Sequence, residues 1–165
     1  MTASPPVASA DRSPRVVGFV CDWAVATQEL TDAAGRLAAH PSVVLIRVPC
    51  SGFIRPAWLE DTLKSGADGV FVVGCPYGDC LNREGNYLMQ ERIEQLQRRL
   101  QRRKVEPERL VMLAHGLHDR EAFLSDVAAM LEALRRLSPP AGAKAAPAAR
   151  AGAPSAAAPA EEGGP

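Results

Sequence analysis

The stretch Gly69-Val70-Phe71-Val72-Val73-Gly74, followed at once by Cys75-Pro76-Tyr77-Gly78-Asp79-Cys80, decides how this chain of 165 residues folds. Its first half is an apolar run, which is typical of a parallel strand covered on both faces. Two similar runs precede it, 15–20 and 43–49, and a cysteine follows each of the three runs directly. The sequence therefore predicts three strands whose carboxyl ends carry Cys21, Cys50 and Cys75.

Helical patterns alternate with these strands. Apolar residues recur at helical spacing over 25–39, from Pro56 to Gly66, over 89–104 and after Asp119, and a fourth strand is predicted over 110–114. This alternation predicts an α/β fold with an open, mainly parallel sheet of four or more strands and helices on both faces.

The chain length is that of a single domain. Residues 1–14 are small, polar and proline-rich, and residues 138–165 are rich in Ala, Pro and Gly with almost nothing large to bury. We expect both segments to be disordered, because burial cannot offset the entropy lost on ordering them. The folded unit is expected to span 15–137.

Composition narrows the function classes. The 19 basic and 19 acidic residues balance, which argues against a nucleic-acid-binding surface. No apolar run approaches the roughly 18 residues that a membrane helix needs, and the first residues do not resemble a secretory signal. A cytoplasmic protein is expected, in which four cysteines favour metal binding or redox chemistry over structural disulfides.

The four cysteines form the candidate site. In an open parallel sheet, ligands bind beyond the carboxyl ends of the strands, so Cys21, Cys50 and Cys75 are expected to converge there. Cys80 follows Cys75 closely and adds a fourth thiol. Iron–sulfur clusters of the 2Fe–2S and 4Fe–4S types both take four cysteine ligands, so a metal or cluster site is predicted.

Three other interpretations of these cysteines remain open. Structural zinc also binds four cysteines, but usually through paired C-x₂₋₄-C motifs, and this chain has only one closely spaced pair. A Cys75/Cys80 dithiol would be redox-active, but it leaves Cys21 and Cys50 unexplained. The cysteines could also be small buried apolar residues.

Residues outside the cysteine set are also candidates. His115 follows the fourth strand and could approach the same edge as a Rieske-like ligand, although a polar loop histidine is the simpler interpretation. Trp23 and Trp58 could shield the site, anchor a partner or pack in the core. The basic cluster over 98–104 is a solvated helix end or a docking surface for an acidic partner.

Several blocks resemble one known family. They are Arg47-Val48-Pro49-Cys50-Ser51-Gly52, Gly66-Ala67-Asp68-Gly69-Val70, Gly74-Cys75-Pro76-Tyr77-Gly78-Asp79-Cys80, Arg83-Glu84-Gly85-Asn86-Tyr87 and Glu106-Pro107-Glu108-Arg109-Leu110. In this order they resemble the small iron–sulfur (delta) subunit of the methyl-viologen-reducing hydrogenase family, over about 16–135.

The resemblance implies a non-catalytic electron-transfer subunit with one 2Fe–2S cluster on Cys21, Cys50, Cys75 and Cys80. It implies electron transfer between a hydrogenase or formate dehydrogenase and the flavin subunit of a heterodisulfide reductase-like complex. The family usually has Cys-x-Trp-Cys where this chain has Cys21-Asp22-Trp23-Ala24. A zinc-bound or cluster-free interaction subunit is therefore the alternative.

Overall fold

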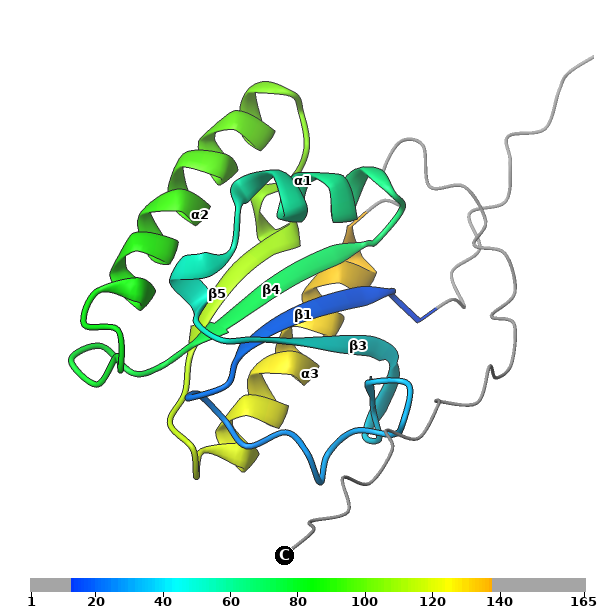
Figure 1. Ribbon diagram of the computed structural model, residues 1–165. Helices are drawn as coiled ribbons and strands as arrows, with labels where there is room; N and C mark the ends of the chain where they lie inside the picture. Colours follow the sequence, from blue (N-terminus) through cyan, green and yellow to red (C-terminus); the bar gives the residue numbers. More distant parts are fainter. Residues whose placement is uncertain (1–12, 138–165) are drawn as a thin grey trace, which may run out of the picture.

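A five-stranded sheet forms the centre of the computed structural model, which describes residues 13–137 (Figure 1). The strands are β1 (Val16–Cys21), β2 (Arg36–Leu37), β3 (His40–Val48), β4 (Gly69–Gly74) and β5 (Leu110–Ala114), in the order β2-β3-β1-β4-β5. The pairs β3–β1, β1–β4 and β4–β5 are parallel, whereas β2 runs antiparallel to β3. The prediction of an open, mainly parallel α/β sheet is confirmed.

Helices cover both faces of this sheet. The helices α1 (Pro56–Lys64) and α2 (Gly85–Arg102) pack on one face and α3 (Arg120–Arg136) on the other (Figure 1). In β4, Val70 and Val72 join the core under α1 and α2, while Phe71 and Val73 join the core under α3. Because both faces of β4 are buried, its sequence is apolar throughout rather than alternating.

The helix predicted over 25–39 is wrong. The segment is turn-rich, and its last part forms β2. The Asp32 carboxylate accepts hydrogen bonds from the backbone N–H groups of Ala34 and Arg36, both at 2.8 Å, and Gly35 has φ +74°. Such a side-chain-capped turn competes with helix formation, and the positive φ at Gly35 ends any helical path.

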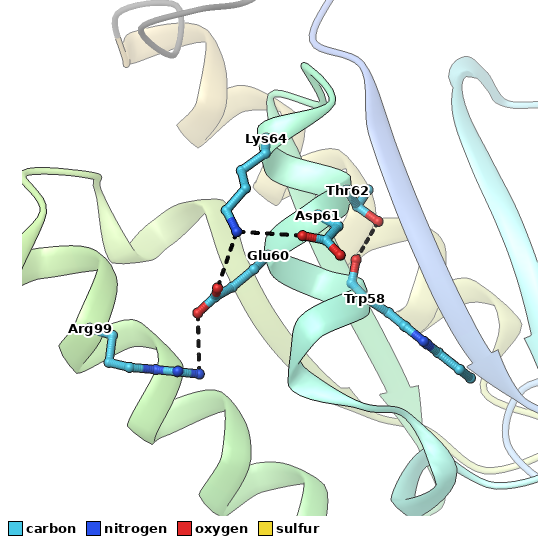
Figure 2. A network of polar contacts seen from close by, with 6 residues as sticks. All are labelled: Trp58, Glu60, Asp61, Thr62, Lys64 and Arg99. Carbon is cyan, nitrogen blue, oxygen red and sulfur yellow. Dashed lines mark hydrogen bonds and ion pairs between the residues drawn. The ribbon is translucent and has the colours of Figure 1, made fainter.

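An ion pair joins the two helices on the same face, and further polar contacts lie within α1 (Figure 2). The Arg99 guanidinium of α2 lies 3.2 Å from the Glu60 carboxylate of α1, and Lys64 contacts Glu60 at 3.5 Å. The Thr62 hydroxyl donates to the Trp58 carbonyl at 2.7 Å. Part of the predicted basic cluster over 98–104 therefore binds α1.

A second polar group lies at the amino ends of the parallel strands, away from the cysteines. The Arg15 backbone N–H donates to the Asp68 carboxylate at 2.7 Å. Arg109, which is 2% exposed and ends the short helix η2 (Pro107–Arg109), donates to the Asp68 carbonyl at 2.9 Å and contacts the Glu106 carboxylate at 2.8 Å. These contacts hold the starts of β1, β4 and β5 together.

Two expectations concern the chain ends. The disorder expected for 1–14 and 138–165 lies, apart from residues 13 and 14, outside the described residues. Within 13–137, none of the helices has the length and apolar character required to cross a membrane.

Candidate metal centre

The cysteines gather at the carboxyl edge of the sheet, in two pairs. Cys21 is the last residue of β1 and Cys75 directly follows β4, the strand beside it. Their Sγ atoms are 3.8 Å apart, and both residues are 2% exposed. Cys50 and Cys80 form the second pair: both sulfur atoms lie beside Gly85, the first residue of α2, and both residues are half-buried.

Backbone groups contact both thiols of the first pair. The Cys75 thiol donates to the Trp23 carbonyl at 3.5 Å, and the Cys21 thiol donates to the Pro49 carbonyl at 3.9 Å. Burial, together with the charge of the neighbouring Cys21 side chain, raises the pKa of Cys75 to about 12. In the metal-free protein these surroundings keep the Cys75 proton in place.

The first turn of α2 borders the second pair. A Cβ atom at Gly85, the first residue of α2, would lie 2.5 Å from Cys50 Sγ and 3.4 Å from Cys80 Sγ. A Cβ atom at Gly52 would lie 2.8 Å from the Gly85 Cα. Glycine at both positions lets the helix start directly against the two sulfur atoms.

This helix start changes the acidity of Cys80. Burial alone would raise the pKa of Cys80, but backbone N–H groups of Asn86, Asn82 and Gly85 and the Cys50 thiol outweigh it and lower that pKa. The free N–H groups at a helix N-terminus carry partial positive charge, which favours a thiolate. The Cys80 thiol therefore ionises more readily than the Cys75 thiol, whose pKa is raised.

Two side chains of α2 hold the cysteine loops in place. The Asn86 side-chain amide, fully buried, donates to the carbonyls of Cys75 and Pro76 at 3.0 and 2.9 Å. The Arg92 guanidinium donates to the carbonyls of Gly52 and Ile54 at 2.7 and 3.1 Å, on either side of Phe53, which ends η1 (Ser51–Phe53). Asn86 thus fixes the loop after β4, and Arg92 fixes the loop after β3.

Sequence reasoning missed Gly85 and Asn86 as site residues. Both belong to the block 83–87 that carries part of the family resemblance, but no motif identified what they contact. The sequence itself favours Gly74 and Gly78, which flank Cys75, for close approach of the backbone to sulfur. A Cβ atom at Gly74 would meet Met112 first, and Gly78, with φ +94°, has no heavy atom near such a Cβ and instead shapes the 76–79 turn.

The other predicted residues have different surroundings. His115 is buried, and its Nε2 lies 3.0 Å from the Asp126 carboxylate of α3, so its side chain is engaged on the α3 face of the sheet. Trp23 is half exposed rather than part of the core, and Trp58 packs edge-on against Phe53.

The separation of the buried sulfur atoms, Cys21 Sγ and Cys75 Sγ, is that of two thiolates bound to one metal ion. Within 13–137, no three His, Cys, Asp or Glu side chains lie close enough together to hold one metal ion. Metal–sulfur bonds of about 2.3 Å at a tetrahedral angle separate two thiolates by about 3.8 Å. Cys21 and Cys75 have this separation, and a 2Fe–2S cluster places two of its four thiolates on each iron.

Ala24 occupies the position where the family pattern has a further cysteine. Its backbone N–H donates to the Cys21 carbonyl at 3.0 Å, and its methyl group is fully buried in the core under α3. The missing thiol therefore leaves a packed methyl group, and the two pairs are formed without it.

Comparisons with known proteins identify a family that this chain resembles over most of its length. The sequence model described as "Methyl-viologen-reducing hydrogenase, delta subunit" matches residues 16–138. The chain is 42% identical over 98 residues to the iron-sulfur subunit of the F420-non-reducing hydrogenase vhc of Methanococcus voltae, covering 59% of this chain and 68% of that protein. It is 40% identical over 104 residues to the iron-sulfur subunit of the F420-non-reducing hydrogenase of Archaeoglobus profundus, covering 62% and 74%.

A longer protein contains a similar region. One subunit of the ferredoxin:CoB-CoM heterodisulfide reductase of Methanosarcina mazei is 31% identical over 127 residues, which are 76% of this chain and 16% of that protein. The family match covers most of the chain and includes all four cysteines. The chain therefore belongs to the methyl-viologen-reducing hydrogenase delta subunit family.

Proposed function

We propose that this chain is an electron-transfer subunit that holds one 2Fe–2S cluster on Cys21, Cys50, Cys75 and Cys80. The observation that carries this proposal is the arrangement of the four thiols as two pairs at one sheet edge, with 3.8 Å between the sulfur atoms of the buried pair. When bound, the cluster supplies one-electron reduction and reoxidation.

The rest of the chain orients and shields the thiols. The core under α3 excludes water from Cys21 and Cys75. Asn86 and Arg92 hold the loops that carry Cys75 and Cys50, and backbone N–H groups at the start of α2 face Cys80. Such contacts around the ligands set the potential and stability of a metal group. We assign no catalytic residue to this chain.

The proposed partners are a hydrogenase or formate dehydrogenase module on one side and a heterodisulfide reductase-like flavin subunit on the other. The names of the relatives support this, since a similar region occurs both in separate hydrogenase subunits and within a longer heterodisulfide reductase chain. We propose the cytoplasm as the location, because all four cysteines are free and that compartment keeps thiols reduced.

A second candidate is a zinc-bound or cluster-free interaction subunit, which Ala24 favours because the family pattern has a cysteine there. A Cys75/Cys80 dithiol is less well supported. Cys75 Sγ lies 3.8 Å from Cys21 Sγ, whereas Cys80 Sγ lies with Cys50 Sγ beside Gly85.

Iron, acid-labile sulfide and zinc analysis of anaerobically purified full-length protein separates these candidates. We expect equal amounts of iron and sulfide, little zinc, and an S = 1/2 EPR signal after dithionite reduction. If the chain holds a cluster, Cys21→Ser should remove most of the iron. If Cys75 and Cys80 act as a dithiol, Cys21→Ser should leave the redox activity of that dithiol unchanged. Stoichiometric zinc, or no metal after reconstitution, would support the interaction subunit instead.

A further inference from the structure

Arg92 of α2 carries a positive charge that forms no ion pair within residues 13–137. Its side chain is half-buried, and its Nη1 donates to the carbonyl oxygens of Gly52 and Ile54 at 2.7 and 3.1 Å. Arg99, two turns later on the same helix, lies instead 3.2 Å from the Glu60 carboxylate. A charge that is removed from water is normally paired, and a neutral amide could donate to the same two carbonyls. Anchoring the loop therefore does not by itself require the charge of Arg92.

The guanidinium of Arg92 is held against the loop that carries Cys50. Arg92 lies two helical turns after Gly85, and so on the same face of α2, and helical side chains lean toward the helix N-terminus. A Cβ atom at Gly85 would lie 2.5 Å from Cys50 Sγ and 3.5 Å from the Gly52 nitrogen. Because the Gly52 carbonyl also binds Arg92, one short loop connects the guanidinium to a proposed cluster ligand.

A fixed cation in this position favours the reduced state of a cluster. Reduction of a 2Fe–2S cluster held by four thiolates adds one negative charge to a group that is already anionic. A nearby cation stabilises the reduced state more than the oxidised state, because Coulomb attraction grows with the charge. Arginine is always charged in proteins, and a half-buried charge is screened by salt less than an exposed one. Two hydrogen bonds fix the guanidinium, so its field is present before the electron arrives.

We propose that Arg92 has a second role beside fixing the loop after β3: its positive charge stabilises the added electron and raises the midpoint potential of the cluster. The inference rests on the proposed 2Fe–2S cluster. One electron from a reduced iron–sulfur or flavin donor converts one ferric iron to ferrous, and no bond is broken and no proton is transferred. Arg92 acts through its field and through the loop that it holds, so it is a positioning residue.

Two substitutions in the full-length protein separate the charge of Arg92 from its loop contacts. Arg92→Gln keeps an N–H donor for the loop carbonyls but removes the charge, whereas Arg92→Lys keeps both. We expect the equilibrium constant for cluster reduction to fall about tenfold in Arg92→Gln, which lowers the midpoint potential by about 59 mV for a one-electron couple. Arg92→Lys should keep the potential of the parent protein. Anaerobic redox titration followed by EPR measures all three potentials.

Arg98→Gln is the matched control, because it removes the same charge from an exposed position further along α2. Water and salt screen an exposed charge, so we expect little change in its midpoint potential. An Arg92→Gln protein that retains its iron and has the potential of the parent would overturn the inference. Equal shifts in Arg98→Gln and Arg92→Gln would also overturn it, because net charge alone would then explain them.

A third substitution decides the inference if Arg92→Gln loses its iron. Arg92→His is charged below and neutral above the ordinary histidine pKa of about 6.5, so one folded protein can be measured in both charge states. We expect its midpoint potential to fall more than that of the parent between about pH 5.5 and pH 8. The other histidines are common to both proteins, so the difference isolates position 92. Parallel pH dependence in the two proteins would overturn the inference.

The outcomes separate the inference from the proposed function. Parent protein without iron and sulfide would overturn both. A parent cluster with the expected iron content and EPR signal, together with unchanged potentials in the Arg92 variants, would overturn the inference alone.

Discussion

At the scale of single residues, the two cysteines of the loop after β4, Cys75 and Cys80, have pKa values shifted in opposite directions. Burial and Cys21 raise the pKa of Cys75 to about 12, while N–H donors lower that of Cys80. Since the thiolate is the nucleophile, metal-free protein should be alkylated by iodoacetamide at Cys80 first, at a pH below the ordinary thiol pKa. Cys75, whose pKa is raised to about 12, should be alkylated much more slowly than Cys80 while the protein remains folded. Peptide mass mapping over a pH series checks this order, and faster labelling of Cys75 would contradict it.

The buried side-chain amide of Asn86 should contribute both to the stability of the protein and to iron retention. In Asn86→Ala, the carbonyls of Cys75 and Pro76 lose their side-chain donor. A buried acceptor left without a partner costs about 1–3 kcal/mol, so the free energy of unfolding of the metal-free protein should fall by about that amount. Iron retention should fall with it, because the Cys75 loop is no longer fixed.

Urea denaturation and iron analysis measure the two effects of Asn86→Ala. Asn82→Ala is the control, because its side chain is exposed and its backbone N–H remains. Unchanged stability in Asn86→Ala would show that the amide does not anchor the loop.

At the scale of elements, Gly85→Ala should have opposite effects on α2 and on the cysteine site: it should favour the helix and disturb the sulfur atoms. Alanine favours helix over glycine by about 1 kcal/mol in a helix interior, and by less at this first position. The new Cβ atom, however, would lie 2.5 Å from Cys50 Sγ, so the sulfur atom or the helix start must move. We expect a normally folded protein with little iron.

Circular dichroism and iron content together test the Gly85→Ala prediction. Gly116→Ala is a suitable control, because the nearest atom to its Cβ is an Asp119 carboxylate oxygen at 3.2 Å, which can move. Full iron content in Gly85→Ala would contradict the close approach of α2 to the second thiol pair.

Most of these strands and helices could be predicted from the sequence, and one could not. The strand-like runs and the helices after Pro56, around Met89–Leu100 and after Asp119 were predicted correctly, because strong apolar periodicity coincides with burial in the structure. The prediction of a helix over 25–39 was wrong because the spacing of apolar residues indicates which positions are buried but does not determine the backbone conformation. Leu37 is buried, as the apolar spacing predicts, but a turn at Asp32 and Gly35 brings it into the core instead of a helix.

For the site, the strand ends predicted which edge carries the thiols but not their pairing. The pairing depends on loop geometry after β3 and β4, which Asn86 and Arg92 fix through contacts distant in the sequence. No periodicity encodes such contacts. Gly85 could have been suspected only from its position at the start of a predicted helix.

At the scale of the whole molecule, exposed apolar side chains follow the strands at the cysteine edge. They are Trp23, Phe53, Tyr77, Leu81, Tyr87, Leu88 and Leu117. Exposed apolar groups of this kind mark interaction surfaces, and aromatic residues are enriched in such interfaces. We expect the flavin-subunit partner to cover Tyr77 and Tyr87, whose rings lie 5.1 Å apart beside the Cys80 loop.

Charge placed on this surface should weaken partner binding without affecting the metal site. Tyr87→Glu should weaken binding to the flavin subunit about tenfold or more, equivalent to about 1.4 kcal/mol, at unchanged iron content. Ser65→Glu, exposed before β4 at the opposite edge, should leave binding unchanged. Isothermal titration calorimetry with the anaerobic partner compares them, and equal affinities would place the interface elsewhere.

Native mass spectrometry of the anaerobically reconstituted chain identifies the group bound by the four cysteines, because it weighs that group. We expect one species heavier than the metal-free chain by two irons and two sulfides, and loss of that species in Cys21→Ser. A mass increase of a single zinc ion, of four irons and four sulfides, or of nothing would contradict a 2Fe–2S cluster held by these four cysteines.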